Sequence, residues 1–128
     1  MNRRFRHALA FVALGVSSAG AADTQRPYDA KLLRLSEILG AVHYLRELCG
    51  ANERQQWRDD MQALVEAEGT SAVRRARLVA SFNKGYRSYR RTYVRCNATA
   101  KTVIERFLSE GTEIAEGLAA SSSGTEQQ

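Results

Sequence analysis

The feature that most constrains the fold of this chain is a segment, residues 29 to 49, with apolar side chains on two sides at helical spacing. Asp29 favours the start of a helix, and Gly50 favours its end because glycine readily adopts a left-handed conformation. One apolar face comprises Leu32, Leu35, Ile38, Leu39, Val42, Leu45 and Cys49. The other comprises Leu33, Tyr44 and Leu48, near Gly40 and Ala41. A helix that is apolar on two sides is usually covered on both, so we predict a central helix.

Residues 52 to 68 form the next predicted helix. Asn52 and Gln55 have the spacing of a capping box, and Gly69 follows the last residue. The only apolar stripe of this segment contains Trp57, Met61, Leu64 and Val65. A single narrow stripe predicts a peripheral helix that packs with one face.

A third helix is predicted to begin at Ser71, and its apolar period continues to residue 118. At 1.5 Å per residue, a helix over residues 71 to 96 would rise roughly 39 Å and would bring Cys96 level with Cys49. A straight continuation would leave Phe107 without a partner. We therefore favour a turn at residues 97 to 99 over one long helix that dimerises through its exposed end.

The fold class follows from these periodicities. The chain has one proline, Pro27, and no convincing alternation of apolar and polar residues. Gly85, inside the third segment, is less favourable in a helix than alanine by about 1 kcal/mol, which indicates either a closely passing backbone or a kink. The predicted fold is all-α, a small bundle of three to four helices over residues 29–49, 52–68, 71–96 and 98–118.

Both ends of the chain are expected to lie outside this bundle. Arg3, Arg4 and Arg6 precede a short apolar run, and residues 19 to 21 are small, as in a cleaved signal peptide over residues 1–21. The run is shorter than the ~20 residues that span a bilayer, so no integral membrane segment is expected after cleavage. The single helical domain, residues 22–118, is then expected in the periplasm, and residues 119–128 are expected to form a disordered tail.

Basic residues gather in the third segment. Residues 74 to 106 contain ten lysines or arginines and one acid, whereas residues 23 to 68 contain nine acids and six bases. The side chains that share one side of the predicted helix are Lys84, Arg87, Arg91 and Arg95, which we call the basic face. This face is either a solvated surface or a binding site for an anionic partner, such as an envelope protein or an anionic envelope polymer.

The opposite side of the same segment is aromatic, with Tyr86, Tyr89 and Tyr93 at helical spacing. Rings in this pattern usually belong to a core with their hydroxyl groups at its boundary, and a ligand groove lined by the rings is the alternative. Nucleic-acid binding is not expected, because stacking rings and cations would need to share one surface.

Cys49 and Cys96 are the only cysteines. In an exported chain an even number of cysteines indicates disulfide bonding, and the helix lengths place both residues at the same end of the bundle. We predict an intramolecular disulfide, with intermolecular pairing as the alternative.

No catalytic constellation accompanies these features. His43 is the only histidine after the signal and is interpreted as a surface pair with Glu47, one turn further on. The adjacent acids Asp59 and Asp60 point about 100° apart and do not converge. Because no Cys-x-x-Cys motif, phosphate loop or nucleophile elbow is present, we expect no enzyme, no cofactor and no metal site.

Several motifs occur together in this chain: LSEILG at residues 35–40, HYLR at 43–46, FNKGYRSY at 82–89 and IERF at 104–107, with Cys49, Tyr93, Cys96, Glu110 and Gly111. In this combination the chain resembles a family of small exported alphaproteobacterial proteins known only as a domain of unknown function. The resemblance covers about residues 27 to 118. It implies a secretory signal and a paired cysteine framework, and it brings no activity, cofactor or catalytic residue.

Two functional hypotheses follow. The first is a non-enzymatic periplasmic helical protein that binds or scaffolds an envelope component through its basic face. The second is a periplasmic small-ligand-binding or chaperone-like protein that uses Tyr86, Tyr89 and Tyr93.

Overall fold

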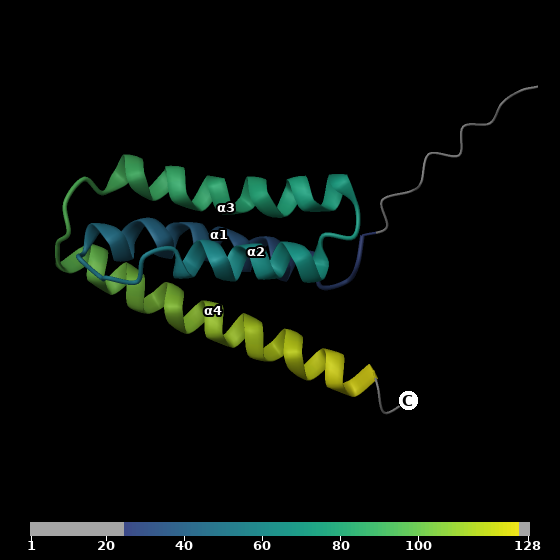
Figure 1. Cartoon of the computed structure of the whole chain (residues 1–128). Helices are drawn as coiled ribbons and strands as arrows, with labels where there is room; N and C mark the ends of the chain where they lie inside the picture. Colours follow the sequence, from purple (N-terminus) through teal and green to yellow (C-terminus); the bar gives the residue numbers. More distant parts are fainter. Residues whose placement is uncertain (1–24, 126–128) are drawn as a thin grey trace, which may run out of the picture.

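The computed structural model describes residues 25–125, and the predicted signal peptide lies outside them. The helices are α1 (Asp29–Leu48), α2 (Gln56–Glu68), α3 (Ala72–Thr92) and α4 (Ala98–Thr125). In Figure 1, α3 lies above α1 and α4 lies below it, and α2, α3 and α4 each pack against α1. No strand occurs in the described part of the chain. The predicted all-α bundle around a central first helix is confirmed.

The core consists of two groups of buried side chains that meet on α1. One group joins α1 to α4 and contains Ile38, Ala41, Val42, Leu45, Ala100, Ile104 and Phe107. The other joins α1 to α2 and α3 and contains Leu32, Met61, Leu78 and Phe82. Burial of apolar surface on more than one side of α1 is the main stabilising contribution to this arrangement.

The backbones of α1 and α3 touch at two glycines. A Cβ atom built on Gly40 would overlap the carbonyl group of Phe82, and one built on Gly85 would overlap the carbonyl group of Glu37. Both glycines are buried, and neither has a positive φ. The crossing therefore requires that neither position carries a side chain. Of the two interpretations of Gly85, the closely passing backbone is correct.

The start of α2 differs from the prediction. The helix begins at Gln56 instead of residue 52, and Gln55 at its N-cap makes no side-chain capping bond. Arg54 has a φ of 53°, which a right-handed helix cannot contain. The Glu53 carboxylate pairs with Arg46 of α1 and accepts the indole N–H of Trp57 at 2.6 Å. These contacts hold the connection between α1 and α2 in a turn, so the predicted capping box is wrong.

The end of α3 also differs. The helix ends at Thr92, four residues before Cys96, and Tyr93 has an extended conformation with φ −118° and ψ 112°. The Tyr93 carbonyl accepts a hydrogen bond from the hydroxyl group of Tyr44 on α1. A turn then follows, and Asn97 Oδ1 caps α4 by accepting the backbone N–H of Ala100 at 2.8 Å. The two-helix interpretation of residues 71 to 118 is therefore correct, with a longer connection than predicted.

Helix α4 continues to Thr125, so the prediction of a disordered tail is wrong for residues 119–125. Ala119 and Ala120 are strong helix formers. The hydroxyl groups of Ser121 and Ser122 donate to the carbonyl oxygens one turn earlier, at 3.0 and 3.1 Å. Residues 126–128 lie outside the described part of the chain.

Replacing the glycine at the crossing tests its role. We expect Gly85→Ala to lower the free energy of unfolding by about 1–3 kcal/mol, because the new methyl group overlaps a backbone carbonyl that cannot move freely. The matched control is Gly117→Ala in α4, where an added Cβ meets no atom within 4 Å. The control should stabilise the protein by up to about 1 kcal/mol. Denaturant unfolding followed by circular dichroism measures both, and equal stabilisation of the two variants would show that the backbones do not touch.

Candidate functional site

The basic face lies on the outer side of α3. Lys84, Arg87 and Arg91 are exposed on this helix. Arg95 is exposed as well, but it lies in the connection to α4 because α3 ends at Thr92. The prediction of one helical row is therefore correct for three of the cations and wrong for Arg95.

The arginines of the basic face differ from the arginines that form ion pairs elsewhere in the bundle. Arg34 pairs with Glu110, Arg46 pairs with Glu53, and Arg74 pairs with Asp29. In contrast, the side chains of Arg87, Arg91 and Arg95 form no ion pair or hydrogen bond with another residue of the described chain. The amine of Lys84 lies 3.9 Å from a carboxylate oxygen of Glu37, but its side chain is 70% exposed, and such surface pairs are weak.

The tyrosine side of α3 contacts other rings. The Tyr86 ring lies 5.5 Å from the Tyr44 ring, between centroids, in an edge-to-face arrangement. Tyr89 stacks on Tyr93 and meets the Phe107 ring of α4 edge-to-face at 5.1 Å. Burial raises the pKa of Tyr89. The three rings thus serve as packing between α1, α3 and α4.

His43 is buried between α1 and α3, with a ring centroid 6.0 Å from that of Phe82 and 5.8 Å from that of Tyr86. Only 7% of the residue is exposed, and burial lowers the pKa of its imidazole. The predicted surface position of His43 is wrong because this side of α1 faces α3, although Glu47 does interact with the imidazole and acts to raise its pKa. Residues 25–125 contain no cluster of three acidic, cysteine or histidine residues that could hold a metal ion. No helix in the same part of the chain is long and apolar enough to cross a membrane.

The two cysteines form the predicted disulfide. Cys49 follows the last residue of α1, and Cys96 lies just before α4, with their Cα atoms 4.9 Å apart. The bond closes a chain segment of 47 residues that contains all of α2 and α3. It is a structural link at one end of the bundle.

A polar network that the sequence analysis missed closes the opposite end. Arg74 is only 6% exposed, and its guanidinium group contacts both carboxylate oxygens of Asp29, at 2.6 and 2.7 Å. The same guanidinium donates to the carbonyl oxygen of Glu68 at 2.5 Å. Arg26 and Tyr28 bind the Glu68 carboxylate at 3.2 Å each. The hydrogen bond from Arg74 is the main reason that the pKa of Asp29 lies below its usual value.

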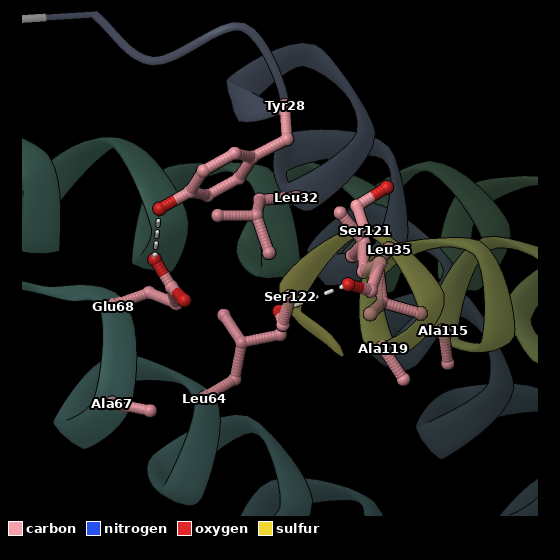
Figure 2. Close-up of a pocket in the computed structure, with 11 residues that line it drawn as sticks. Tyr28, Leu32, Leu35, Leu64, Ala67, Glu68, Ala115, Ala119, Ser121 and Ser122 are labelled. Atoms are coloured by element: carbon pink, nitrogen blue, oxygen red, sulfur yellow. Dashed lines mark hydrogen bonds between the residues drawn. The ribbon is translucent and has the colours of Figure 1, made fainter. Parts of the chain in front are cut away.

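The structure also contains a groove between α2 and α4, which we call the α2–α4 groove. No Cα atom of α2 lies within 8 Å of one in α4, so the two helices rest on α1 with a gap between them. Two cavities, of about 490 and 310 Å³, fill this gap and share Leu35, Leu64 and Ala115 as lining residues. Figure 2 shows the larger cavity, with Tyr28 and Glu68 hydrogen-bonded at one side and Leu32, Leu35 and Leu64 beside it.

The sequence held one indirect signal for this groove. Helix α1 is apolar on two sides, and the α4 side chains beside the groove are mostly small, such as Gly111, Ala115 and Ala119. Small side chains cannot reach across to α2. The gap itself depends on the angle at which α4 leaves α1, which no local pattern encodes.

Breaking the buried ion pair gives a pH-dependent prediction. Asp29→Asn should lower the free energy of unfolding by about 3 kcal/mol at neutral pH, because it leaves the buried Arg74 charge with only the Glu68 carboxylate, at 3.4 Å, as a charged partner. The folded-state pKa of Asp29 lies below its unfolded value of about 3.9, so its contribution is complete above that pH and is lost as the pH falls through the folded-state pKa. The difference between wild type and variant should therefore shrink below about pH 4.

Denaturant unfolding at several pH values measures this difference. The matched control is Asp59→Asn, which changes an exposed acid of α2 and should shift stability by no more than about 0.5 kcal/mol. A difference that stays constant down to the lowest pH would contradict an ionic contribution from Asp29.

A family model described as "Protein of unknown function (DUF2385)" matches residues 27–121, which include α1, α2, α3 and most of α4. No curated protein and no solved structure matches the chain. The matched segment agrees with the motifs at residues 35–46 and 82–107 and extends past residue 118, where α4 continues. The chain therefore belongs to the DUF2385 family of proteins of unknown function.

Proposed function

We propose that this chain is an exported, non-enzymatic helical protein of the alphaproteobacterial periplasm that binds or scaffolds an anionic envelope component through its basic face. The observation that carries the proposal is that Arg87 and Arg91 project from one side of α3 with no ion pair to any other described residue. Export is supported by the sequence of residues 1–21 and by the Cys49–Cys96 disulfide, since such bonds persist in oxidising compartments.

The spacing of the cations suits an extended anionic ligand. Arg87 and Arg91 lie four residues apart, or roughly 6 Å along the helix axis, and Lys84 extends the row to roughly 10 Å. Guanidinium groups bind phosphate and carboxylate through bidentate hydrogen bonds. Because α3 is fixed against α1 at Gly85, the row is presented on a rigid helix and loses little conformational entropy on binding.

A purely structural role accounts for only part of this row. Cations near the C-terminus of a helix interact favourably with its dipole, and Arg91 lies in the last turn of α3. That effect is confined to the terminal turn, so it does not explain Lys84 or Arg87.

The tyrosine-based alternative has less support. Tyr86 and Tyr89 contact rings of α1 and α4, so a ligand would need to separate these helices to reach them. The non-enzymatic part of the proposal rests on the sequence, which contains no recognised catalytic motif.

Charge reversal tests the proposal. Arg87→Glu/Arg91→Glu should weaken binding to phosphatidylglycerol vesicles or to purified lipopolysaccharide by at least about tenfold, since each cation near an anionic surface contributes about 1 kcal/mol. Wild-type binding should weaken as salt is added. The matched control is Lys31→Glu/Lys101→Glu, which makes the same charge change at exposed positions of α1 and α4.

Vesicle co-sedimentation and light scattering measure the affinities, and circular dichroism checks that all variants are folded. Equal losses in the two double variants would indicate a nonspecific charge effect. If wild type binds neither probe, crosslinking in living cells is done with wild type and with Arg87→Glu/Arg91→Glu. A crosslinked envelope protein that the double variant loses would be the partner, and the absence of such a protein would mean that the basic face has no anionic partner.

A further inference from the structure

We propose that the α2–α4 groove binds an amphipathic helix of a partner protein, with the apolar side of that helix in the groove and a cationic flank beside Asp60. This site goes beyond the proposed role of the basic face, which lies on α3. In Figure 1, α3 and α4 lie on opposite sides of α1, so the two surfaces are separate.

The dimensions of the groove fit a helix. Its two cavities share Leu35, Leu64 and Ala115, which makes them one continuous trough with α1 as its floor. Along α4 the lining residues run from Phe107 to Ser122, or roughly 23 Å at 1.5 Å per residue. This length corresponds to about four helical turns, typical of a helix that inserts anchors at i, i+3, i+4 and i+7 into an apolar groove.

The packing of α4 explains why the groove is present in the folded chain. Phe107 is buried against α1, and Arg34 binds Glu110 through two hydrogen bonds, of 2.7 and 2.9 Å. Beyond this point Figure 1 shows α4 inclined away from the other helices. Apart from Leu118, the side chains that α4 presents there are small, including Ala115 and Ala119, so the backbone of another helix can approach closely.

The charges of the lining indicate the chemistry of the partner. Asp60 and Glu68 are the only charged residues that line the two cavities, and both are acidic. Glu68 is neutralised by Arg26 and Arg74. Asp60 is exposed and has no ion pair with another residue among those described, so it remains available to a cation. Trp57, one turn before Asp60, lines the same cavity and is an aromatic ring of the kind that a cation binds.

An acyl chain fits these observations less well. It could fill the apolar trough, but a fatty acid or an anionic lipid would bring a negative head group toward an unneutralised carboxylate. A lysine or arginine on the flank of a helix instead pairs with Asp60 while its neighbours bury apolar surface. Complementary charge of this kind mainly increases the association rate and the specificity.

A defined peptide tests the site in the full-length mature protein. The probe is a synthetic helix of about 14 residues that contains only leucine on one side and lysine on the other. Trp57 is the only tryptophan of the chain and lines the groove, so its fluorescence reports binding directly. We expect saturable binding with a shift of the Trp57 emission to shorter wavelength, and much weaker binding of the same peptide with glutamate in place of lysine.

Two variants with matched controls locate the binding. Asp60→Lys should weaken the affinity by about tenfold at low salt, whereas Asp59→Lys, on the neighbouring exposed position outside the groove, should change it little. Ala115→Phe should block the groove, whereas Ala120→Phe, exposed on the same helix and not among the lining residues, should not. Arg87→Glu/Arg91→Glu should bind the peptide as wild type does, which separates this result from that of the basic face.

Other outcomes would overturn the proposal. Equal binding of the lysine and glutamate peptides, or equal effects of Asp59→Lys and Asp60→Lys, would contradict the proposal that a cationic flank of the partner helix pairs with Asp60. Binding of palmitate that Ala115→Phe abolishes, without binding of the peptide, would make the groove a lipid site. A concentration-dependent dimer that Ala115→Phe abolishes, measured by analytical ultracentrifugation, would assign the groove to a second copy of the chain.

Discussion

The close crossing of α1 and α3 at Gly40 and Gly85 determines how the rest of this bundle is arranged. Each glycine lies against a carbonyl group of the opposite helix, at Phe82 and at Glu37. This proximity sets the rotation of α3 about its axis, because only one side of the helix can lie so close. The tyrosines beside Gly85 are consequently turned toward α1 and α4. Lys84, Arg87 and Arg91 are turned toward solvent, so the basic face is a consequence of the crossing.

The two ends of the α1–α3 pair are held by different chemistry. At one end the Cys49–Cys96 disulfide and the hydrogen bond from Tyr44 to Tyr93 fix the connection to α4. At the other end, the ion pair of Arg74 with Asp29 joins the beginnings of the two helices, and Arg74 also binds the end of α2. Among residues 25–125, no disulfide or ion pair joins the C-terminal part of α4 to another helix, since the pair of Glu110 with α1 lies near the middle of α4. This asymmetry leaves the gap that forms the α2–α4 groove.

The two proposed binding surfaces differ in chemistry. On the basic face, Arg87 and Arg91 are unpaired cations on a rigid helix, suited to an anionic component of the envelope. The α2–α4 groove is apolar with one unpaired carboxylate, Asp60, at its edge, suited to an amphipathic helix with a cationic flank. A protein with both surfaces could hold two different partners on opposite sides of α1, which is consistent with the proposed scaffolding role.

The sequence by itself determined the elements of this protein. Helical periodicity predicted three to four helices with a central first helix, the two cysteines predicted the disulfide, and Gly85 indicated either a close crossing or a kink, because each of these signals is local or a matter of counting. Tertiary structure decided the ends of the helices. The contact of Arg46 with Glu53 delays the start of α2, and the contact of Tyr44 with Tyr93 ends α3, although propensity alone would extend both helices. It also decided the site. The residues of the basic face were predictable. The lack of ion pairs at its arginines, the Arg74 network and the α2–α4 groove were not, because they depend on how whole helices are placed relative to one another.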